Sequence, residues 1–295
     1  MGQELQRQLG IFNFNKTQKY YMNNDSNKGT PLIFNQPLGT FASQDSFLAE
    51  LTKLETPPLQ KKCLVINNVT LDSSKTMLAL SEIISTFSVA RPLMLVICGP
   101  LLSFKNFLGG QNAQIMKQSL QNFYNLLTTN ERYLKDTYII LVPDVEDLGT
   151  TQLPKKPLPD YFFQNFINKF PLFFLAENPF RFGVFGREVV ISRVDLLKDF
   201  CRKSICPVLQ GNDMTSNLVN TIRGQRSLVP LPFRMRQRFV RCDNSINFLK
   251  QPEIVVVCDN FSKKFVEGGF CSPGNFANEG GWLDIDLGTG AIVIN

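Results

Sequence analysis

Short apolar runs that alternate with helical patterns constrain the fold of this sequence more than any other feature. The runs are mostly apolar at odd and even positions alike, which is typical of strands buried on both faces of a sheet. Strands of this kind, separated by helices and short connections, predict an α/β protein built around a largely buried sheet. The runs lie at residues 63–69, 93–98, 138–142, 188–192, 254–258 and 291–294.

Apolar residues spaced three and four positions apart predict the helices between these runs. The glycine-rich residues 108–111 precede one of them, but they lack the Gly-Lys-Ser/Thr that completes a phosphate-binding loop. We therefore interpret residues 108–111 as a turn. The predicted helical segments lie at residues 77–87, 113–127, 162–170 and 196–200.

The first 60 residues have a different character, because they are polar and rich in Asn and in turn signals. Asp45 can cap a short helix over residues 45–54, and Pro57 and Pro58 follow it as a boundary. We therefore predict an N-terminal segment over residues 1–60 and a folded domain over residues 61–295.

The chain contains no His, and this absence excludes several classes of enzyme. Ser-His-Asp and Cys-His catalysis both need an imidazole, and so do the common zinc sites built on His. The seven Cys form no Cys-x-x-Cys pair, and several stand inside apolar runs. We interpret them as small buried residues of a protein in a reducing compartment, and we expect no cofactor.

The sequence contains no signal for a membrane. Its start has no apolar stretch, and Gln6 stands where a myristoylation signal needs Ser or Thr. No apolar run approaches the ~20 residues that span a bilayer. We therefore expect a soluble intracellular protein without membrane contact.

The excess of basic residues is concentrated in one stretch. The chain has 31 basic and 25 acidic residues, and six Arg between Asp213 and Asp243 account for the whole net charge of +6. Three of them stand two positions apart and predict one face of an extended strand. Such a surface could contact DNA phosphates, an acidic partner protein or only solvent. The six are Arg223, Arg226, Arg234, Arg236, Arg238 and Arg241.

The residues that follow the predicted strands are the candidate site, because open α/β sheets bind ligands beyond the carboxyl ends of their strands. Their order and spacing resemble the calcineurin-like metallophosphoesterase fold, whose strand ends carry D-x-H, G-D-x-x-D, G-N-H-D/E and G-H-x-H. Carried over by position, nearly every metal ligand of that pattern is replaced in this chain. The matching positions hold Asn68, Thr70, Pro100, Ser103, Glu146, Asp147, Asp259 and Phe261.

The resemblance implies a phosphoesterase-type β-sandwich flanked by helices, with its metal ligands lost and no catalytic residue. Proline has no side-chain ligand, and Phe261 cannot bind a metal, whereas a two-metal site needs a bridging carboxylate and several further ligands. The alternative is a residual metal-dependent phosphoesterase that uses the remaining acids. These acids are Asp144, Glu146, Asp147 and Asp259.

Longer segments narrow the resemblance to one inactivated branch. Asn178-Pro-Phe-Arg181 and Gly186-Arg-Glu-Val-Val-Ile-Ser-Arg-Val-Asp195 are similar to segments of the B-subunits of replicative DNA polymerases, most of all in the epsilon branch. The resemblance covers about residues 62–276. Members of this family also carry an OB-fold, so residues 1–60 are expected to include the edge of one.

Membership in this branch implies a non-catalytic accessory subunit that binds and stabilises the catalytic subunit of a polymerase in the nucleus. The implied partner surface is the Cys-rich C-terminal module of that catalytic subunit. Other replisome subunits are further implied partners, and DNA would be contacted weakly or indirectly. A B-subunit of polymerase alpha or delta is the alternative within the family.

Overall fold

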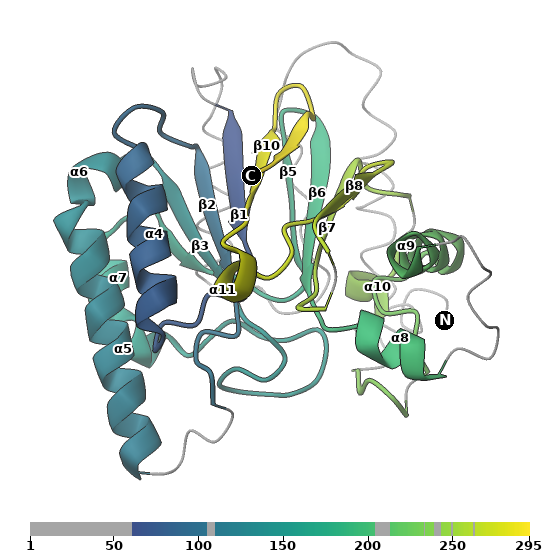
Figure 1. Ribbon diagram of the computed structural model, residues 1–295, viewed down its shortest axis with the longest axis horizontal. Helices are drawn as coiled ribbons and strands as arrows, with labels where there is room; N and C mark the ends of the chain where they lie inside the picture. Colours follow the sequence, from purple (N-terminus) through teal and green to yellow (C-terminus); the bar gives the residue numbers. More distant parts are fainter. Residues whose placement is uncertain are drawn as a thin grey trace, which may run out of the picture.

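The computed structural model of the 295-residue chain describes residues 61–104, 110–203, 213–232, 234–238, 243–248, 250–261 and 263–295. The helix expected over residues 45–54 and the OB-fold edge expected within residues 1–60 lie outside this part of the chain. Two β-sheets packed face to face, with helices on both outer sides, make up the described residues (Figure 1).

The first sheet has six strands in the order β11-β10-β1-β2-β3-β4. Its strands β1 to β4 run parallel, because each connection between them passes through a helix. The strand β10 is antiparallel to both of its neighbours. The bounds are β1 Lys62–Ile66, β2 Met94–Cys98, β3 Tyr138–Val142, β4 Phe173–Leu175, β10 Leu283–Asp286 and β11 Ile292–Ile294.

The second sheet has five strands in the order β5-β6-β7-β9-β8. Its three central strands are parallel, and the edge strands β5 and β8 pair with them antiparallel. The bounds are β5 Phe180–Val184, β6 Arg187–Arg193, β7 Ile254–Cys258, β8 Phe265–Glu267 and β9 Phe270–Ser272.

Helices cover the outer side of each sheet (Figure 1). Those beside the first sheet are α4 (Ser74–Thr86), α5 (Gly110–Thr129), α6 (Glu131–Leu134) and α7 (Gln164–Lys169), with a 3-10 turn at Asp160–Phe162. Those beside the second sheet are α8 (Leu197–Lys203), α9 (Met214–Gln225) and α10 (Asp243–Ile246). The short helix α11 (Phe276–Glu279) follows β9.

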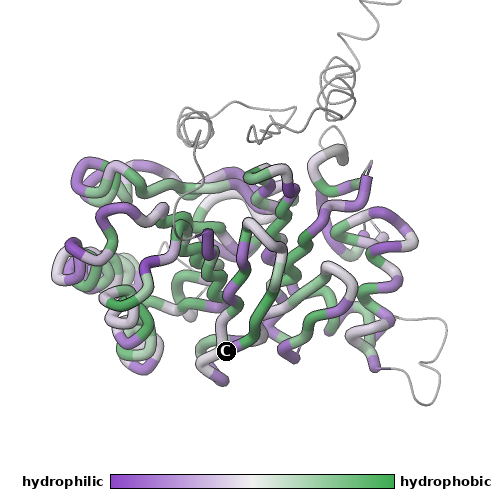
Figure 2. The backbone as a smooth tube through the Cα atoms, turned by 90° about the horizontal axis from the view of Figure 1, so that it is seen from above, coloured by the Kyte–Doolittle hydropathy of each residue, from purple (hydrophilic) through white to green (hydrophobic). Residues whose placement is uncertain are grey.

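Both faces of the central strands are buried because each sheet has protein on both sides. In β2, Met94, Val96 and Cys98 belong to the core between the two sheets, whereas Leu95 and Ile97 pack under α4 and α5. The strand β7 alternates in the same way between the shared core and a third apolar cluster beneath α9. Figure 2 shows the hydrophobic colour along the strands in the interior and the hydrophilic colour toward the periphery. This layering explains runs that are apolar at every position.

The strands and helices predicted within the described residues are confirmed, with small shifts at their ends. The first run ends at Ile66 rather than Val69, because Asn68 turns the chain with a φ of 61°. The second predicted helix begins at Gly110, so part of the glycine-rich stretch is already helical. Prediction from the sequence missed β4, β8, β9 and β10, which have only three or four residues each, and also missed β5, which has five and is mostly buried.

The strand β10 returns to the beginning of the domain and pairs with β1. Leu283 and Ile285 are fully buried in the core between the sheets, while Asp284 and Asp286 point away from it. The Lys62 ammonium lies 2.7 Å from the carboxylate of Asp284 across the pair. The alternation of apolar and acidic residues is typical of a strand with one solvated face.

The cysteines that the structure describes are free thiols, and four of the five are buried. Burial raises the pKa of Cys63 and of Cys271, so these thiols stay protonated at neutral pH. This placement agrees with the interpretation of the cysteines as small apolar residues. Cys201 is exposed, and Cys206 and Cys242 lie outside the described residues.

Replacing Ile285 with Ala tests whether β10 contributes to the core. The side chain is fully buried, so we expect the variant to lose about 2–5 kcal/mol of unfolding free energy, measured by denaturant titration. Val293 on β11 is 55% exposed, and its change to Ala is the control, with an expected loss below about 0.5 kcal/mol. Equal losses in the two variants would contradict the assignment of β10 to the core.

Candidate functional site

The carboxyl ends of strands from both sheets meet in one place, and Arg193 lies at its centre. This residue ends β6, and its side chain is fully buried. Its Nε donates to the Gly99 carbonyl at 2.6 Å, just beyond β2, and its Nη1 donates to the Cys258 carbonyl at 3.1 Å, at the end of β7. Through one side chain, the first sheet is therefore tied to the second.

Two carboxylates balance the charge of this guanidinium. Arg193 Nη1 lies 2.7 Å from Asp195 Oδ1, and Nη2 lies 3.3 Å from Asp144 Oδ2. Burial by itself lowers the pKa of Arg193, but the two acids raise it above its ordinary value, so the group stays charged. Burial likewise favours the neutral form of Asp195, and Arg193 outweighs it and lowers the pKa of that carboxyl.

Asp147 occupies the neighbouring position after β3 and binds backbone rather than a ligand. Its Oδ1 accepts from the Leu101 amide at 2.9 Å, and its Oδ2 accepts from the Asp144 amide at 2.8 Å. Burial and the charge of Asp144 raise its pKa to about 6. A Cβ atom at Gly99 would collide with this carboxylate, which explains the glycine.

Asp259 stands after β7 and has a similar structural role. Its Oδ2 accepts from the amides of Leu196 and Leu197 at 2.6 and 2.7 Å, which fixes the start of α8. Its Oδ1 accepts from the Phe261 amide at 2.7 Å. The Phe261 ring is 52% exposed, and the Lys198 ammonium lies 5.1 Å from its centroid.

The other positions carried over from the phosphoesterase pattern lie at the same edge but do not converge on one point. Asn68 donates to Asn275 Oδ1 at 2.7 Å, and the hydroxyl of Thr70 lies 3.3 Å from that of Thr76. The side chain and the amide of Ser103 bind Asp72, and Glu146 is exposed. Pro100 follows Gly99 through a cis peptide bond.

The arrangement does not provide the ligands of a two-metal centre. Within the described part of the chain, no group of three or more Cys, Asp and Glu could hold a metal ion. The oxygens of Asp144, Asp147 and Asp259 accept from protein donors, as described above. Among the described residues, the buried acceptors without a partner at this edge are the amide oxygens of Asn67 and Asn260. Divalent cations prefer sites that include carboxylates.

A second cation, Lys155, reinforces the loop that carries these acids. Its side chain is almost completely buried, and its ammonium donates to the carbonyls of Val145, Asp147 and Thr150 at 3.2, 2.6 and 2.9 Å. Asn178 joins this loop to β6, because its amide donates to the carbonyls of Pro143 and Arg193.

Sequence reasoning missed Arg193, Lys155 and Asn178. Arg193 and Asn178 stand in the segments that carried the family resemblance. The candidate site, however, was chosen from the positions that align with the metal ligands of the phosphoesterase pattern, and these two residues are not among them. A charged residue two positions after Val189–Ile191, still within a strand buried on both faces, is the signal that could have identified Arg193. A charge at such a place must be paired inside the protein.

The Arg-rich stretch does not form the predicted strand. Residues 234–236 form a turn, so the expectation of one extended face with Arg234, Arg236 and Arg238 is wrong. Arg236 donates to the Asp195 carbonyl at 2.6 Å and pairs with Asp199 at 3.3 Å, and Arg238 donates to the Val229 carbonyl.

Of the remaining arginines of the stretch, one makes a contact within the chain and two are exposed to solvent. Arg223 packs over the ring of Phe270 at 5.2 Å, whereas Arg226 and Arg234 are exposed. Arg241 lies outside the described residues. The stretch is therefore partly structural, because several of its charges bind the chain itself.

A family profile for the B-subunit of DNA polymerases alpha and epsilon matches residues 63–267. The chain belongs to this family. DNA polymerase epsilon subunit 2 of Mus musculus is 25% identical over 236 residues, which cover 78% of this chain and 44% of that protein. DNA polymerase epsilon subunit 2 of Drosophila melanogaster is 25% identical over 229 residues, which cover 76% and 42%. This chain of the B-subunit family thus spans less than half the length of these relatives.

A solved structure, TT1561 of Thermus thermophilus, matches 80% of this B-subunit chain and 98% of its own chain. The TM-score is 0.40 and the sequence identity is 12%. The two sheets and the flanking helices of the chain itself agree with the α/β sandwich that the resemblance implies.

Replacing Arg193 with Ala leaves Asp144 and Asp195 without their shared cation. Removing one partner of a buried pair costs about 3–5 kcal/mol, so we expect the melting temperature to fall by roughly 10 °C or more. Thermal unfolding followed by circular dichroism measures this fall. Arg202→Ala on the exposed face of α8 is the control, and an equal effect of both changes would contradict the central role of Arg193.

The buried carboxyl of Glu177 makes the unfolding free energy of the chain depend on pH. Its side chain is only 6% exposed, and burial raises its pKa from 4.5 to about 7, against the opposing charge of Lys156. The unfolded chain ionises this carboxyl at lower pH than the folded chain does. The folded state is therefore penalised above pH 7, and the penalty disappears as the pH falls through about 7 toward 4.5.

Glu177→Gln removes this ionisation. We expect the variant to be more stable than the original chain by on the order of 2 kcal/mol at pH 8, with the advantage shrinking toward pH 5. Urea titrations at both pH values measure the difference, and Glu82→Gln on α4 is the exposed control. An advantage of the same size at both pH values would refute the explanation.

Proposed function

We propose that this chain is a non-catalytic accessory subunit of a replicative DNA polymerase of the epsilon type. The observation that carries the proposal is the buried Arg193 at the edge where the strand ends of both sheets meet. A guanidinium enclosed by two carboxylates and two carbonyls leaves no open coordination position, whereas metal-assisted hydrolysis needs a metal and room for substrate and water.

In this proposal the α/β sandwich serves as a scaffold that binds and stabilises the catalytic subunit. The family and the names of the relatives favour the epsilon branch over the alternatives of polymerase alpha or delta. The proposed contact is the Cys-rich C-terminal module of the polymerase chain, so any essential metal belongs to that partner. Other replisome subunits are further proposed partners, and the place of action is the nucleus.

None of the helices in the described part of the chain is long and apolar enough to cross a membrane. DNA contact is proposed to be weak or indirect. Among the arginines of this stretch that the structure describes, Arg236 and Arg238 bind the chain's own carbonyls, whereas Arg226 and Arg234 are exposed. Exposed charges of this kind can pair with acids on a protein partner.

Co-expression with polymerase C-terminal modules tests the proposal. We expect the chain to co-purify with the module of the epsilon catalytic subunit at least tenfold better than with those of alpha and delta. A stable association buries a large apolar surface, so the chain alone is expected to expose apolar surface that binds a dye and that the module covers. Preference for the alpha or delta module would reassign the branch, and binding to none of the three would refute the accessory function.

A hydrolysis assay on the same preparation distinguishes the scaffold from a residual phosphoesterase. We expect no turnover of a phosphodiester or phosphomonoester with Mn²⁺, Mg²⁺ or Zn²⁺ above that of buffer. Turnover that co-purifies with the chain and disappears in Glu146→Gln, an exposed change that leaves the buried network intact, would overturn the proposal.

A further inference from the structure

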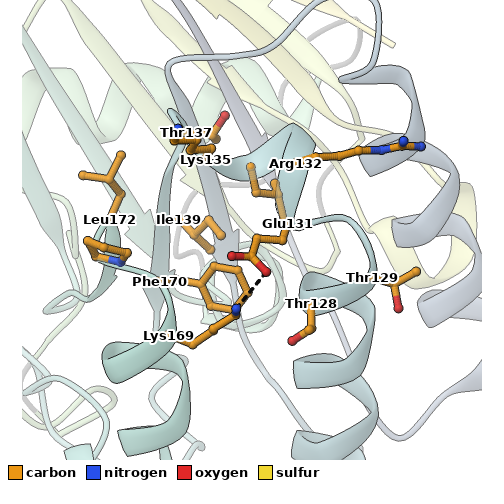
Figure 3. Close-up of a pocket in the computed structure, with 12 residues that line it drawn as sticks. Thr128, Thr129, Glu131, Arg132, Lys135, Thr137, Ile139, Lys169, Phe170 and Leu172 are labelled. Carbon is orange, nitrogen blue, oxygen red and sulfur yellow. Dashed lines mark ion pairs between the residues drawn. The ribbon is translucent and has the colours of Figure 1, made fainter.

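A cavity of about 810 Å³ at the amino ends of β3 and β4 has most of its charges engaged within the chain (Figure 3). The Lys169 ammonium lies 2.8 Å from the Glu131 carboxylate, the ion pair drawn in the figure. Arg132 lies over the ring of Tyr133. This lining selects no ligand. A more specific surface lies at the far side of the same sheet, where β11 is the edge strand.

The hydrogen bonds between β10 and β11 determine which backbone groups of β11 face outward. Asn295, just after β11, exchanges two hydrogen bonds with Trp282, just before β10, at 3.0 and 3.3 Å. Bonded and non-bonded pairs alternate along an antiparallel ladder, so the backbone groups of Val293 face β10. The N–H and C=O groups of Ile292 and Ile294 therefore point to the outer edge. In the described part of the chain, no strand pairs with that edge.

The side chains beside this edge are apolar and only partly covered. Ile292 and Ile294 pack against the core between the two sheets and are half-buried. The strand β8, at the edge of the second sheet, lies beside β11. Its Val266 faces the same core, because it stands opposite the buried Cys271, and yet it is 46% exposed. The described residues thus leave the core between the sheets partly open along this seam.

We propose that β11 binds an extended segment of a partner protein as an additional antiparallel strand. The outward N–H and C=O groups of Ile292 and Ile294 supply the hydrogen bonds of this pairing. Alternate side chains of the segment point into the seam toward Val266, so they are apolar. Antiparallel pairing is slightly more stable than parallel pairing, and it continues the arrangement of β10 and β11.

The composition of β11 supports an edge that is occupied by another chain. Native edge strands are commonly protected by charged residues, Pro or bulges. Among the described edge strands, β5 carries Arg181, β8 carries Glu267 and β4 is buried. The strand β11 has none of these protections, because it consists of Ile292, Val293 and Ile294. An apolar edge of this kind is a site where strands associate.

An extended segment fits this edge better than a second copy of the chain. A stable dimer interface buries ~1,200 Å² or more, and two paired β11 strands would contribute only three residues each. A single extended segment satisfies the same backbone groups and also reaches Val266 in the seam. The inference goes beyond the proposed function, because it concerns a surface defined by the fold whichever polymerase chain is the main partner.

The experiment titrates the purified full chain with a capped fluorescent peptide in which Val alternates with Thr. In antiparallel pairing with the Val side chains directed into the seam, the Val residues donate their N–H groups to β11. Two further peptides carry N-methyl groups on all Val or on all Thr residues. We expect methylation of Val to weaken binding at least tenfold and methylation of Thr to weaken it less than threefold.

Variants of the chain locate the binding. Ile294→Pro removes one outward N–H, and Pro is tolerated on the free side of an edge strand. Ile294→Ala is the matched control, because it also removes the Ile side chain but keeps the N–H. We expect the Pro variant to bind the peptide at least tenfold more weakly than the Ala variant. Circular dichroism checks that both variants are folded, and the methylated peptides test the original chain if the Pro variant is not.

Several outcomes would overturn the inference. Among them are equal effects of the two methylation patterns, a loss with methylated Thr alone, and no binding at about 1 mM peptide. Another is a concentration-dependent dimer that persists in Ile294→Ala and is lost in Ile294→Pro, because β11 would then pair with a second copy. The proposed accessory function is tested separately by co-purification, so either proposal can fail without the other.

Discussion

A buried positive charge that must be neutralised inside the protein is the constraint on which the arrangement of the two sheets depends. Arg193 needs partners in the apolar interior, because moving an unpaired charge there from water has a large unfavourable free energy. Its partners come from β2, β3 and β7 as well as from the segment after β6. Apolar packing alone would allow the two sheets to contact each other in many orientations. The hydrogen bonds of Arg193 are directional, so they require the strand ends of the two sheets to lie in one relative position.

The same cluster explains how several buried acids are accommodated at the strand ends. Metal sites and buried ion pairs meet the same physical demand, namely that carboxylates withdrawn from water need compensating positive charge or hydrogen-bond donors. In this chain Arg193 supplies the charge for Asp144 and Asp195, and backbone amides supply the donors for Asp147 and Asp259. The strand-end acids of this B-subunit family member are therefore part of its architecture.

The central strands could be predicted from the sequence because their signal is local. A run such as Ile254–Cys258 is apolar at every position, and only a strand with protein on both faces accommodates that pattern. The strands β8 and β9 have only three residues each, and β10 alternates with Asp, so none of them produces such a run.

The candidate site depends on partners distant in sequence, so it is harder to predict. The contact of Arg193 with Gly99 joins residues 94 positions apart, and no local pattern encodes it. A period of two among the arginines indicates a strand, whereas residues 234–236 form a turn. The guanidinium groups of Arg236 and Arg238 bind carbonyls of neighbouring loops, which periodicity cannot reveal.

The pairing of β1 with β10 has a consequence for the order in which the chain folds. The ion-paired residues Lys62 and Asp284 of these two strands are 222 positions apart, so β1 is made long before the strand that pairs with this edge. Until then β1 presents one unpaired edge, which is the kind of surface that aggregates or attracts other strands. Contacts of such long range also slow folding. Closing this edge of the first sheet is therefore a late step of folding, which can occur only after β10 has been made.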